Sequence, residues 1–322
     1  MLKGCALNWV LSNDGTQILF GQKDIDALSA AGATVVRFDL RLGSRTSWDA
    51  TIIANYTTVI NQMLHAGLTP IVLLGPGIVY GATQTQWNAN NVENGGSGWN
   101  NFLQQYVNTV RKLASTYTQV PLWEIWNEPN AWTSHPSATV YTGGSFIYPS
   151  LYANVLSRVY AYFPVNVPVI SGGLLGHDIA GLNADSAGAT YLAQVYGYLR
   201  GVQAFDAIGW HCYLDQGKVL DPEHVQQYLN DLFKVMVEND DARSPLPLYV
   251  TEFGWQQPGT TTDVQAENVA TLLRVLRNNG YVAVACNFED RDNPAASQYY
   301  GLYTNDWTPK PARDAFLAGG TP

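Results

Sequence analysis

The sequence predicts a closed (β/α)8 barrel, an α/β fold, in a single domain over residues 1–322. Short apolar runs alternate eight times with segments of helical period, which is typical of βα units. The runs are almost continuously apolar, as expected for parallel strands buried on both faces. No linker, charge block or low-complexity stretch divides the chain. A doubly wound open sheet is the alternative, but no nucleotide-binding fingerprint follows the first run.

The strand-like runs are rich in aliphatic and β-branched residues. They are Gly4–Val10, Thr34–Leu40, Thr69–Leu74, Leu122–Asn127, Val167–Ser171, Phe205–His211, Leu246–Glu252 and Tyr281–Phe288. The three cysteines, Cys5, Cys212 and Cys286, lie in or beside these runs, so we expect buried free thiols and no disulfide framework.

The segments between the runs carry one apolar stripe each, which predicts amphipathic helices that cover the strands. Asp221 and Pro222 form a cap and a first-turn proline, and apolar side chains from Val225 to Met236 then recur at helical spacing. Similar stripes lead up to Gly67 and Gly280, and each glycine is placed for a left-handed helix C-cap.

The amino-acid composition limits the kinds of molecule that the protein is expected to bind. The formal charge is -9 and the pI about 4.9, which excludes the basic face that nucleic acid requires. Only 13% of the residues are charged, whereas ten Trp and nineteen Tyr supply flat faces on which neutral sugars can stack. The longest apolar runs have the length of strands, so we expect no membrane span. We therefore expect an uncharged partner, an oligo- or polysaccharide. We also expect the protein to be a monomer.

The first residues, Met1 to Trp9, enter a strand at once, and no signal peptide is visible. Two interpretations of the compartment stay open: a cytoplasmic protein, or a secreted protein whose export signal is absent from this sequence. The second is slightly favoured.

Two glutamates at strand ends point to chemistry. Glu128 follows the fourth run and Glu252 ends the seventh, although strands seldom favour Glu and cores seldom bury it unpaired. In a barrel of this kind, the carboxyl ends of the strands meet at one mouth, and strands four and seven face each other across it. One carboxylate could then attack a sugar carbon while the other protonates the departing oxygen, as in most glycoside hydrolases. We expect neither a metal ion nor an organic cofactor.

Other polar or aromatic side chains also fall at strand ends. They are Asn8, Trp9, Arg37, Asp39, Asn127, His211, Tyr213 and the stretch from Asn287 to Asp290.

Three motifs carry a resemblance to a known clan of enzymes. Trp126-Asn127-Glu128-Pro129 matches an Asn-Glu-Pro motif, Thr251-Glu252-Phe253-Gly254 a nucleophile segment, and His211-Cys212-Tyr213 a strand-six His-x-Tyr motif. With these motifs the chain resembles the clan A retaining glycoside hydrolases, of cellulase and xylosidase type, over nearly its whole length. The nearest branch stays open between family 39-like and family 5-like members.

The resemblance implies that Glu128 is the general acid/base, that Glu252 is the nucleophile and that Asn127 holds the 2-hydroxyl of the sugar. Glu128 must keep a proton near the working pH, whereas Glu252 must stay ionised and so needs hydrogen-bond donors. Arg37 and Tyr213 are the candidate donors, because a guanidinium keeps its charge and a phenol can give one hydrogen bond.

Four further residues are candidates for substrate binding. His211 is expected to bond Glu128 or the substrate, and a purely structural barrel histidine is the alternative. Trp132 and Trp255 are possible platforms for sugar rings. Phe288 stands where the clan commonly has a Trp beneath the sugar at the cleavage point.

We expect the two carboxyl groups to lie roughly 5 Å apart, the spacing of a retaining mechanism. The expected function is endo-acting hydrolysis of a neutral β-linked polysaccharide, such as a glucan, mannan or xylan. An exo-acting β-glycosidase or xylosidase and a transglycosylase are the alternatives within this chemistry. A catalytically idle barrel that binds carbohydrate is the alternative outside it.

Overall fold

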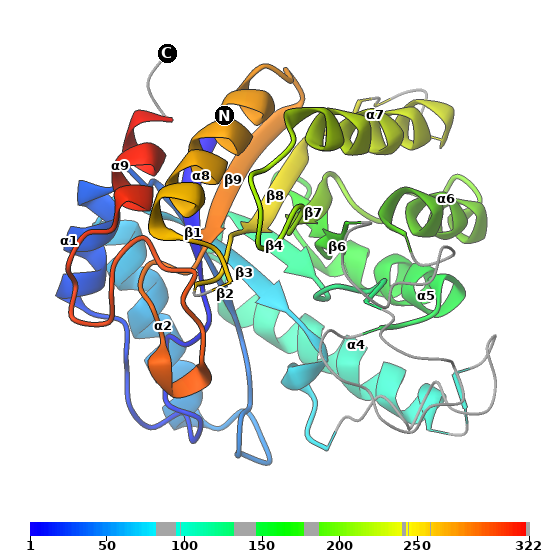
Figure 1. The fold of residues 1–322 in the computed structure, drawn as a ribbon. Coiled ribbons are helices and arrows are strands. Elements are labelled where there is room, and N and C mark those ends of the chain that lie inside the picture. The colour runs from blue at the N-terminus through cyan, green and yellow to red at the C-terminus, as the bar shows by residue number, and fades with distance from the viewer. Residues whose placement is uncertain are drawn as a thin grey trace.

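Parallel strands form one sheet that curls into a barrel, with the helices outside it (Figure 1). The computed structural model describes residues 1–81, 95–96, 98–131, 146–176, 187–239, 243, 245–257 and 259–319. The strands are β1 (Leu2–Leu7), β2 (Val35–Asp39), β3 (Thr69–Leu74), β4 (Leu122–Ile125), β5 (Val169–Ser171), β6 (Leu174–Leu175), β7 (Ile208–Cys212), β8 (Leu248–Phe253) and β9 (Val282–Phe288). The predicted (β/α)8 fold is confirmed.

The helices follow the strands in the predicted alternation. They are α1 (Gln22–Ala30), α2 (Ala50–His65), α4 (Trp99–Thr116), α5 (Pro149–Val159), α6 (Gly188–Leu199), α7 (Pro222–Asn239), α8 (Thr262–Arg277) and α9 (Pro311–Ala318). The stripes predicted for α2 and α8 are buried, as expected, and so is that of α7 except for Phe233, which is 37% exposed. Gly67 ends α2 with φ 75°, as predicted, but the prediction for Gly280 is wrong, because Asn278 caps α8 in a right-handed conformation.

The fifth predicted strand differs from the expectation, since it forms two short segments, β5 and β6. The strand order runs from β5 through β4 to β1 and then from β9 to β6, so the barrel closes where these two segments meet. The Ser171 amide donates to the Ala207 carbonyl at 2.9 Å, which joins β5 to the approach to β7.

Gly172 and Gly173 account for this break. A Cβ on Gly172 would lie 2.4 Å from the Trp126 carbonyl oxygen, and one on Gly173 would lie 2.1 Å from the ring of His211. Glycine at these two positions therefore lets the backbone approach two neighbouring elements more closely than any side chain would allow.

The core has two parts. The larger part lies between the strands and the helices, while a smaller cluster fills the barrel interior with residues such as Val35, Ile71, Ile170 and Val284. Cys5, Cys212 and Cys286 are buried thiols, as predicted. Within the described part of the chain, no helix is both long and apolar enough to cross a membrane.

Candidate active site

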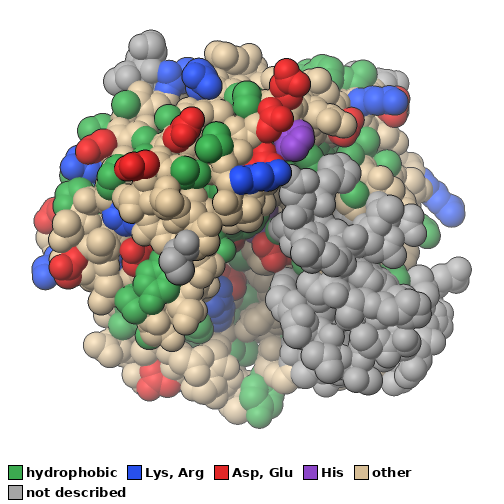
Figure 2. Space-filling model, viewed as in Figure 1, with side chains coloured by type: hydrophobic (Ala, Val, Ile, Leu, Met, Phe, Trp, Pro, Cys, Tyr) green, Lys and Arg blue, Asp and Glu red, His purple; other side chains and the backbone are tan. Residues whose placement is uncertain are grey.

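A cavity of about 850 Å³ opens at the carboxyl ends of the strands. Figure 2 shows a hollow on this face, with acidic and basic side chains at its base. Six of the predicted site residues line the cavity: Arg37, Asn127, Glu128, Tyr213, Glu252 and Phe288. The fold thus brings residues from distant parts of the sequence to one mouth.

The turn after β4 brings Asn127 and Glu128 to the cavity. Trp126 has φ 76° and Glu128 φ 46°, values that few residues with side chains adopt. The indole of Trp126 is fully buried and packs against Tyr106 and Phe102, with ring centroids 5.6 and 6.0 Å away. This packing holds the unusual backbone in place and leaves Glu128 at the mouth.

Glu252 lies within a strand rather than after one. The pairing of β8 with β9 is irregular between Val250 and Phe253, and Glu252 is only 8% exposed. Its Oε1 accepts a hydrogen bond from Arg37 Nη1 at 2.5 Å, and its Oε2 accepts one from the Tyr213 hydroxyl at 2.6 Å. Both predicted donors therefore contact this carboxylate.

These contacts set the charge of Glu252. Burial opposes ionisation, but the neighbouring His211 imidazole, the Arg37 guanidinium and the Tyr213 phenol outweigh it and lower the pKa of Glu252. Burial, together with the charge of Glu252, raises the pKa of Tyr213 well above its ordinary value, so the phenol keeps the proton that it donates. The surroundings of Glu252 thus favour its ionised form.

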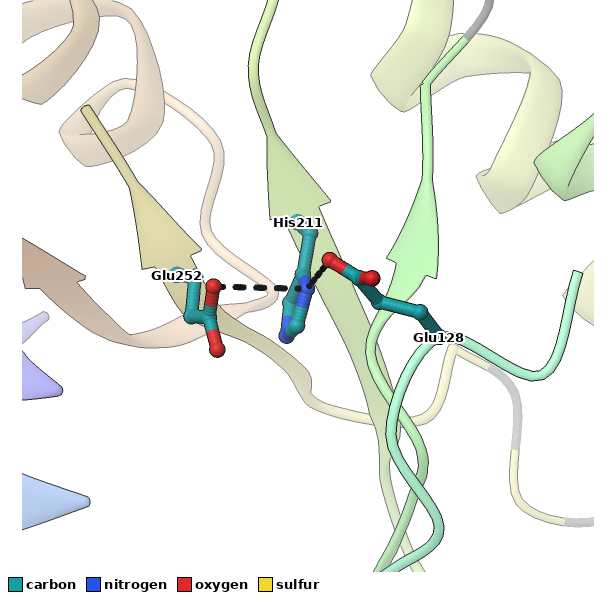
Figure 3. Close-up of side chains that lie close together, drawn as sticks. All are labelled: Glu128, His211 and Glu252. Carbon is teal, nitrogen blue, oxygen red and sulfur yellow. Dashed lines mark hydrogen bonds and ion pairs between the residues drawn. The ribbon is translucent and has the colours of Figure 1, made fainter. Parts of the chain in front are cut away.

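Glu128 has different surroundings. Its Oε1 lies 3.0 Å from Nδ1 of His211, which is also 3.7 Å from Glu252 Oε2. In Figure 3 the two carboxyl groups point toward each other from opposite sides, with the imidazole between them. One oxygen of each glutamate and one nitrogen of His211 lie within 4.8 Å of one another. That separation leaves little room for a water molecule between the carboxyl groups.

This group of three residues could also hold a metal ion, since each offers one ligand atom. Two contacts oppose that use. Arg37 sets a permanent positive charge against Glu252, and Tyr213 already donates to the Glu252 oxygen nearest the imidazole. The surroundings therefore suit the transfer of protons better than the binding of a cation.

The other predicted residues differ in their placement. Asn127 Oδ1 accepts from Arg37 Nη2 at 2.8 Å, which leaves the amide nitrogen as the group that can donate to a substrate. Phe288 lines the cavity, with its ring 5.4 Å from that of Tyr300. His211 is fully buried, so of its two predicted roles the structure supports contact with Glu128 rather than with substrate.

The prediction that Trp255 is a sugar platform is wrong. Its side chain has 0% exposure, and its Nε1 donates to the Leu214 carbonyl at 2.9 Å. The indole supports the loop that follows β7 and cannot stack on a sugar. Trp132 lies outside the described residues.

Sequence reasoning missed Glu124, which is fully buried in β4 and bonds Arg37. The argument applied to Glu128, that strands seldom contain an unpaired Glu, would also have identified it. Asn130 was missed as well: its side chain bonds both the amide and the carbonyl of Leu175, which ties the turn after β4 to β6. Nothing in the sequence distinguishes this Asn from a loop residue.

One rim of the cavity carries an exposed aromatic ring. Trp9 is 42% exposed, and the Arg41 guanidinium lies over its ring at 4.8 Å. Arg41 also donates to Asp39 Oδ2 at 2.5 Å and to Asn8 Oδ1 at 3.4 Å. These four residues form a polar rim with one flat face beside the cavity.

Two further carboxyl groups follow β9. Glu289 is 4% and Asp290 6% exposed. Burial, with the charge of Asp290, raises the pKa of Glu289 to about 8, and burial, with the charge of Asp24, raises the pKa of Asp290 to about 7. Both carboxyls therefore hold protons at pH values where ordinary carboxylates are ionised.

Solved structures with the same fold are numerous. A family 39 glycoside hydrolase from Bacteroides cellulosilyticus WH2 is 19% identical, with a TM-score of 0.67 over 98% of this chain and 62% of that one. Thermotoga maritima Cel5A in complex with cellobiose is 14% identical, with a TM-score of 0.67 over 98% and 97%. An endo-β-1,3-glucanase of family GH128 from Amycolatopsis mediterranei, in complex with laminarihexaose, is 14% identical, with a TM-score of 0.58 over 99% of both chains.

No protein-family model matches the chain, and no curated protein matches its sequence. At these identities the similarity establishes the barrel fold. The chain spans less than two thirds of the family 39 protein.

Proposed function

We propose that this protein is a retaining glycoside hydrolase that cleaves β-glycosidic bonds, with Glu252 as nucleophile and Glu128 as general acid/base. The observation that carries the proposal is the pair of facing carboxyl groups within 4.8 Å of each other, of which only Glu252 contacts the Arg37 cation among the described residues. Two carboxyl groups about 5 to 5.5 Å apart are the arrangement of a double displacement. The similarity of the fold to a family 39 glycoside hydrolase and to an endo-β-1,3-glucanase of family GH128 supports it.

In the first step, a Glu252 oxygen forms a bond to the anomeric carbon while the bond from that carbon to the leaving oxygen breaks. Glu128 transfers its proton to the leaving oxygen, and the sugar becomes an ester of Glu252. Arg37 and Tyr213 hold the nucleophile in position and keep it ionised until it reacts.

In the second step, Glu128 takes a proton from water as the water oxygen bonds the anomeric carbon and the ester bond breaks. Two inversions at the same carbon return the original configuration. His211 bonds Glu128 from within the barrel and orients its carboxyl group for both proton transfers. Asn127 is placed to donate a hydrogen bond to the sugar beside the reacting carbon.

The substrate that the site favours is a neutral β-linked polysaccharide, cut within the chain. The cavity continues to the rim of Asn8, Asp39 and Arg41, and the exposed Trp9 lies next to these residues. An aromatic face with neighbouring hydrogen-bonding groups suits a sugar unit beyond the one that reacts. The complex of a similar structure with laminarihexaose supports a long glycan ligand.

The decisive experiment incubates the protein with soluble and insoluble β-glucans, mannans and xylans and sizes the products, with Glu252→Gln as the matched control. Shortened oligosaccharides from the wild type alone support endo action, whereas monosaccharide release supports exo action. Longer products with an added acceptor indicate transglycosylation, and binding without turnover indicates an idle barrel.

A trapping experiment tests the nucleophile directly. A 2,4-dinitrophenyl 2-deoxy-2-fluoroglycoside should add one fluoroglycosyl group to the protein, and peptide mass mapping should locate it on Glu252. NMR of the first product should show the configuration of the substrate. An inverted product, or a label on another residue, would refute the assignment.

A further inference from the structure

We propose that Glu124 is a positioning residue for the nucleophile: it holds the Arg37 guanidinium in the orientation that serves Glu252 and Asn127, and it shares the charge of Arg37. This inference rests on the proposed function, because it concerns the residue assigned as nucleophile there. Glu124 itself lies away from the cavity and does not line it.

Arg37 makes a different contact with each of its three nitrogens. Nε donates to Glu124 Oε2 at 2.5 Å, Nη1 to Glu252 Oε1 at 2.5 Å and Nη2 to Asn127 Oδ1 at 2.8 Å. A guanidinium is planar, so fixing the Nε edge also fixes the directions in which the other two nitrogens point. The contact with Glu124 therefore determines whether Arg37 reaches both mouth residues at once.

Glu124 is itself held firmly. The residue has 0% exposure, and its Oε1 accepts hydrogen bonds from the Gly173 amide and from Thr251 Oγ1, both at 3.0 Å. Gly173 lies in the break between β5 and β6, and Thr251 directly precedes Glu252 on β8. One buried carboxylate thus joins β2, β8 and the break in the fifth strand.

The charge of Glu124 matters as much as its position. Arg37 lies between two carboxylates, so each sees only part of its positive charge. If the charge of Glu124 is removed, the whole charge of Arg37 acts on Glu252, which becomes more stable as an anion and less reactive as a nucleophile. The other titratable groups that face Glu252 stay the same: His211, Glu128, Tyr213, Tyr300, Glu289 and Cys286.

The test is Glu124→Gln, which keeps the size of the side chain and removes its charge. We expect kcat to fall about 10- to 100-fold with KM within about twofold, because the interaction acts in the chemical step. The acid limb of the pH profile of kcat/KM should move to lower pH, opposite to the shift expected when Arg37 is replaced by Met. A loss of kcat without this shift would indicate a merely structural role and overturn the proposal.

Asp206→Asn is the matched control, because Asp206 also uses a carboxylate to hold the sheet, through the Val169 amide at 2.9 Å, but does not line the cavity. We expect wild-type kcat and an unmoved acid limb. A shift as large as that of Glu124→Gln would overturn the proposal.

If Glu124→Gln does not fold, Thr251→Val tests the proposal instead, because it removes one hydrogen-bond donor to Glu124 and leaves all charges in place. A fall in kcat of about threefold with KM unchanged supports the proposal, and wild-type kcat overturns it. If the wild type is active and the Glu124→Gln variant is equally active, this inference is overturned but the proposed function is not. A wild type with no turnover on any glycan overturns the proposed function as well.

Discussion

The end of β4 and the end of β8 each present a glutamate to the same cavity, yet by different means. Glu128 leaves its strand through a backbone turn with two positive φ values, and its carboxyl group contacts the imidazole of His211. Glu252 stays within its strand and receives hydrogen bonds from Arg37 and Tyr213. The two glutamates thus have different surroundings, and the donors around Glu252 favour its ionised form.

Replacing Glu252, the proposed nucleophile, should have the largest effect on this comparison. Glu252→Ala should lower kcat by at least about 10⁴-fold, because the covalent step loses its proposed nucleophile. Steady-state kinetics on an aryl β-glycoside measure the loss. Added azide should restore part of the turnover and give a product of inverted configuration. Wild-type activity in this variant would remove Glu252 from the mechanism.

Replacing Glu128, the proposed general acid/base, should lower kcat to an extent that depends on the leaving group. Glu128→Ala should lower kcat about 10²- to 10⁴-fold for a natural glycan. A dinitrophenyl glycoside, whose leaving group needs no proton, should be far less affected in the first step. Equal losses for both substrates would contradict the assignment of Glu128.

Tyr213→Phe sharpens the comparison by removing one donor from Glu252. Because that hydrogen bond lowers the pKa of Glu252, its loss should raise this pKa and move the acid limb of kcat/KM to higher pH. We expect kcat to fall about tenfold. Tyr303→Phe, whose hydroxyl bonds the Ala27 carbonyl far from the site, is the control and should keep the wild-type profile.

Glu289 is a third carboxyl group for comparison, and replacing it should have the smallest effect of these substitutions. Within the described chain its Oε2 is buried without a hydrogen-bond partner, and its pKa is raised to about 8. The folded protein therefore keeps a proton that the unfolded chain releases above pH about 4.3. The contribution of Glu289 to the free energy of unfolding is complete below that pH and is lost as the pH rises through about 8.

Glu289→Gln should remove this dependence. Relative to the wild type, its free energy of unfolding should increase between pH 5 and pH 8 by roughly 3 to 4 kcal/mol. Urea denaturation at both pH values measures the change. A constant difference between the two proteins would show that Glu289 titrates as an ordinary carboxyl.

The sequence predicted the barrel and the two facing glutamates because both depend on local signals. Apolar runs and helical stripes indicate which residues are buried, and strand-end motifs indicate which side chains lie at the mouth of the barrel. The break in the fifth strand was not predictable, because it depends on how closely Gly173 approaches His211 from another strand. Trp255 was misjudged for a similar reason: its indole is a plausible platform in the sequence, and only the packing beneath the loop shows that it is buried.

The glycine pair between β5 and β6 has a consequence for recognising related proteins. A single added methyl group at Gly173 would displace the imidazole that contacts Glu128, and would do so without altering any of the three motifs. A genome survey that selects candidates by their two glutamates alone would therefore gather inactive barrels together with active ones. Requiring glycine at both positions of this break would separate them before any protein is purified.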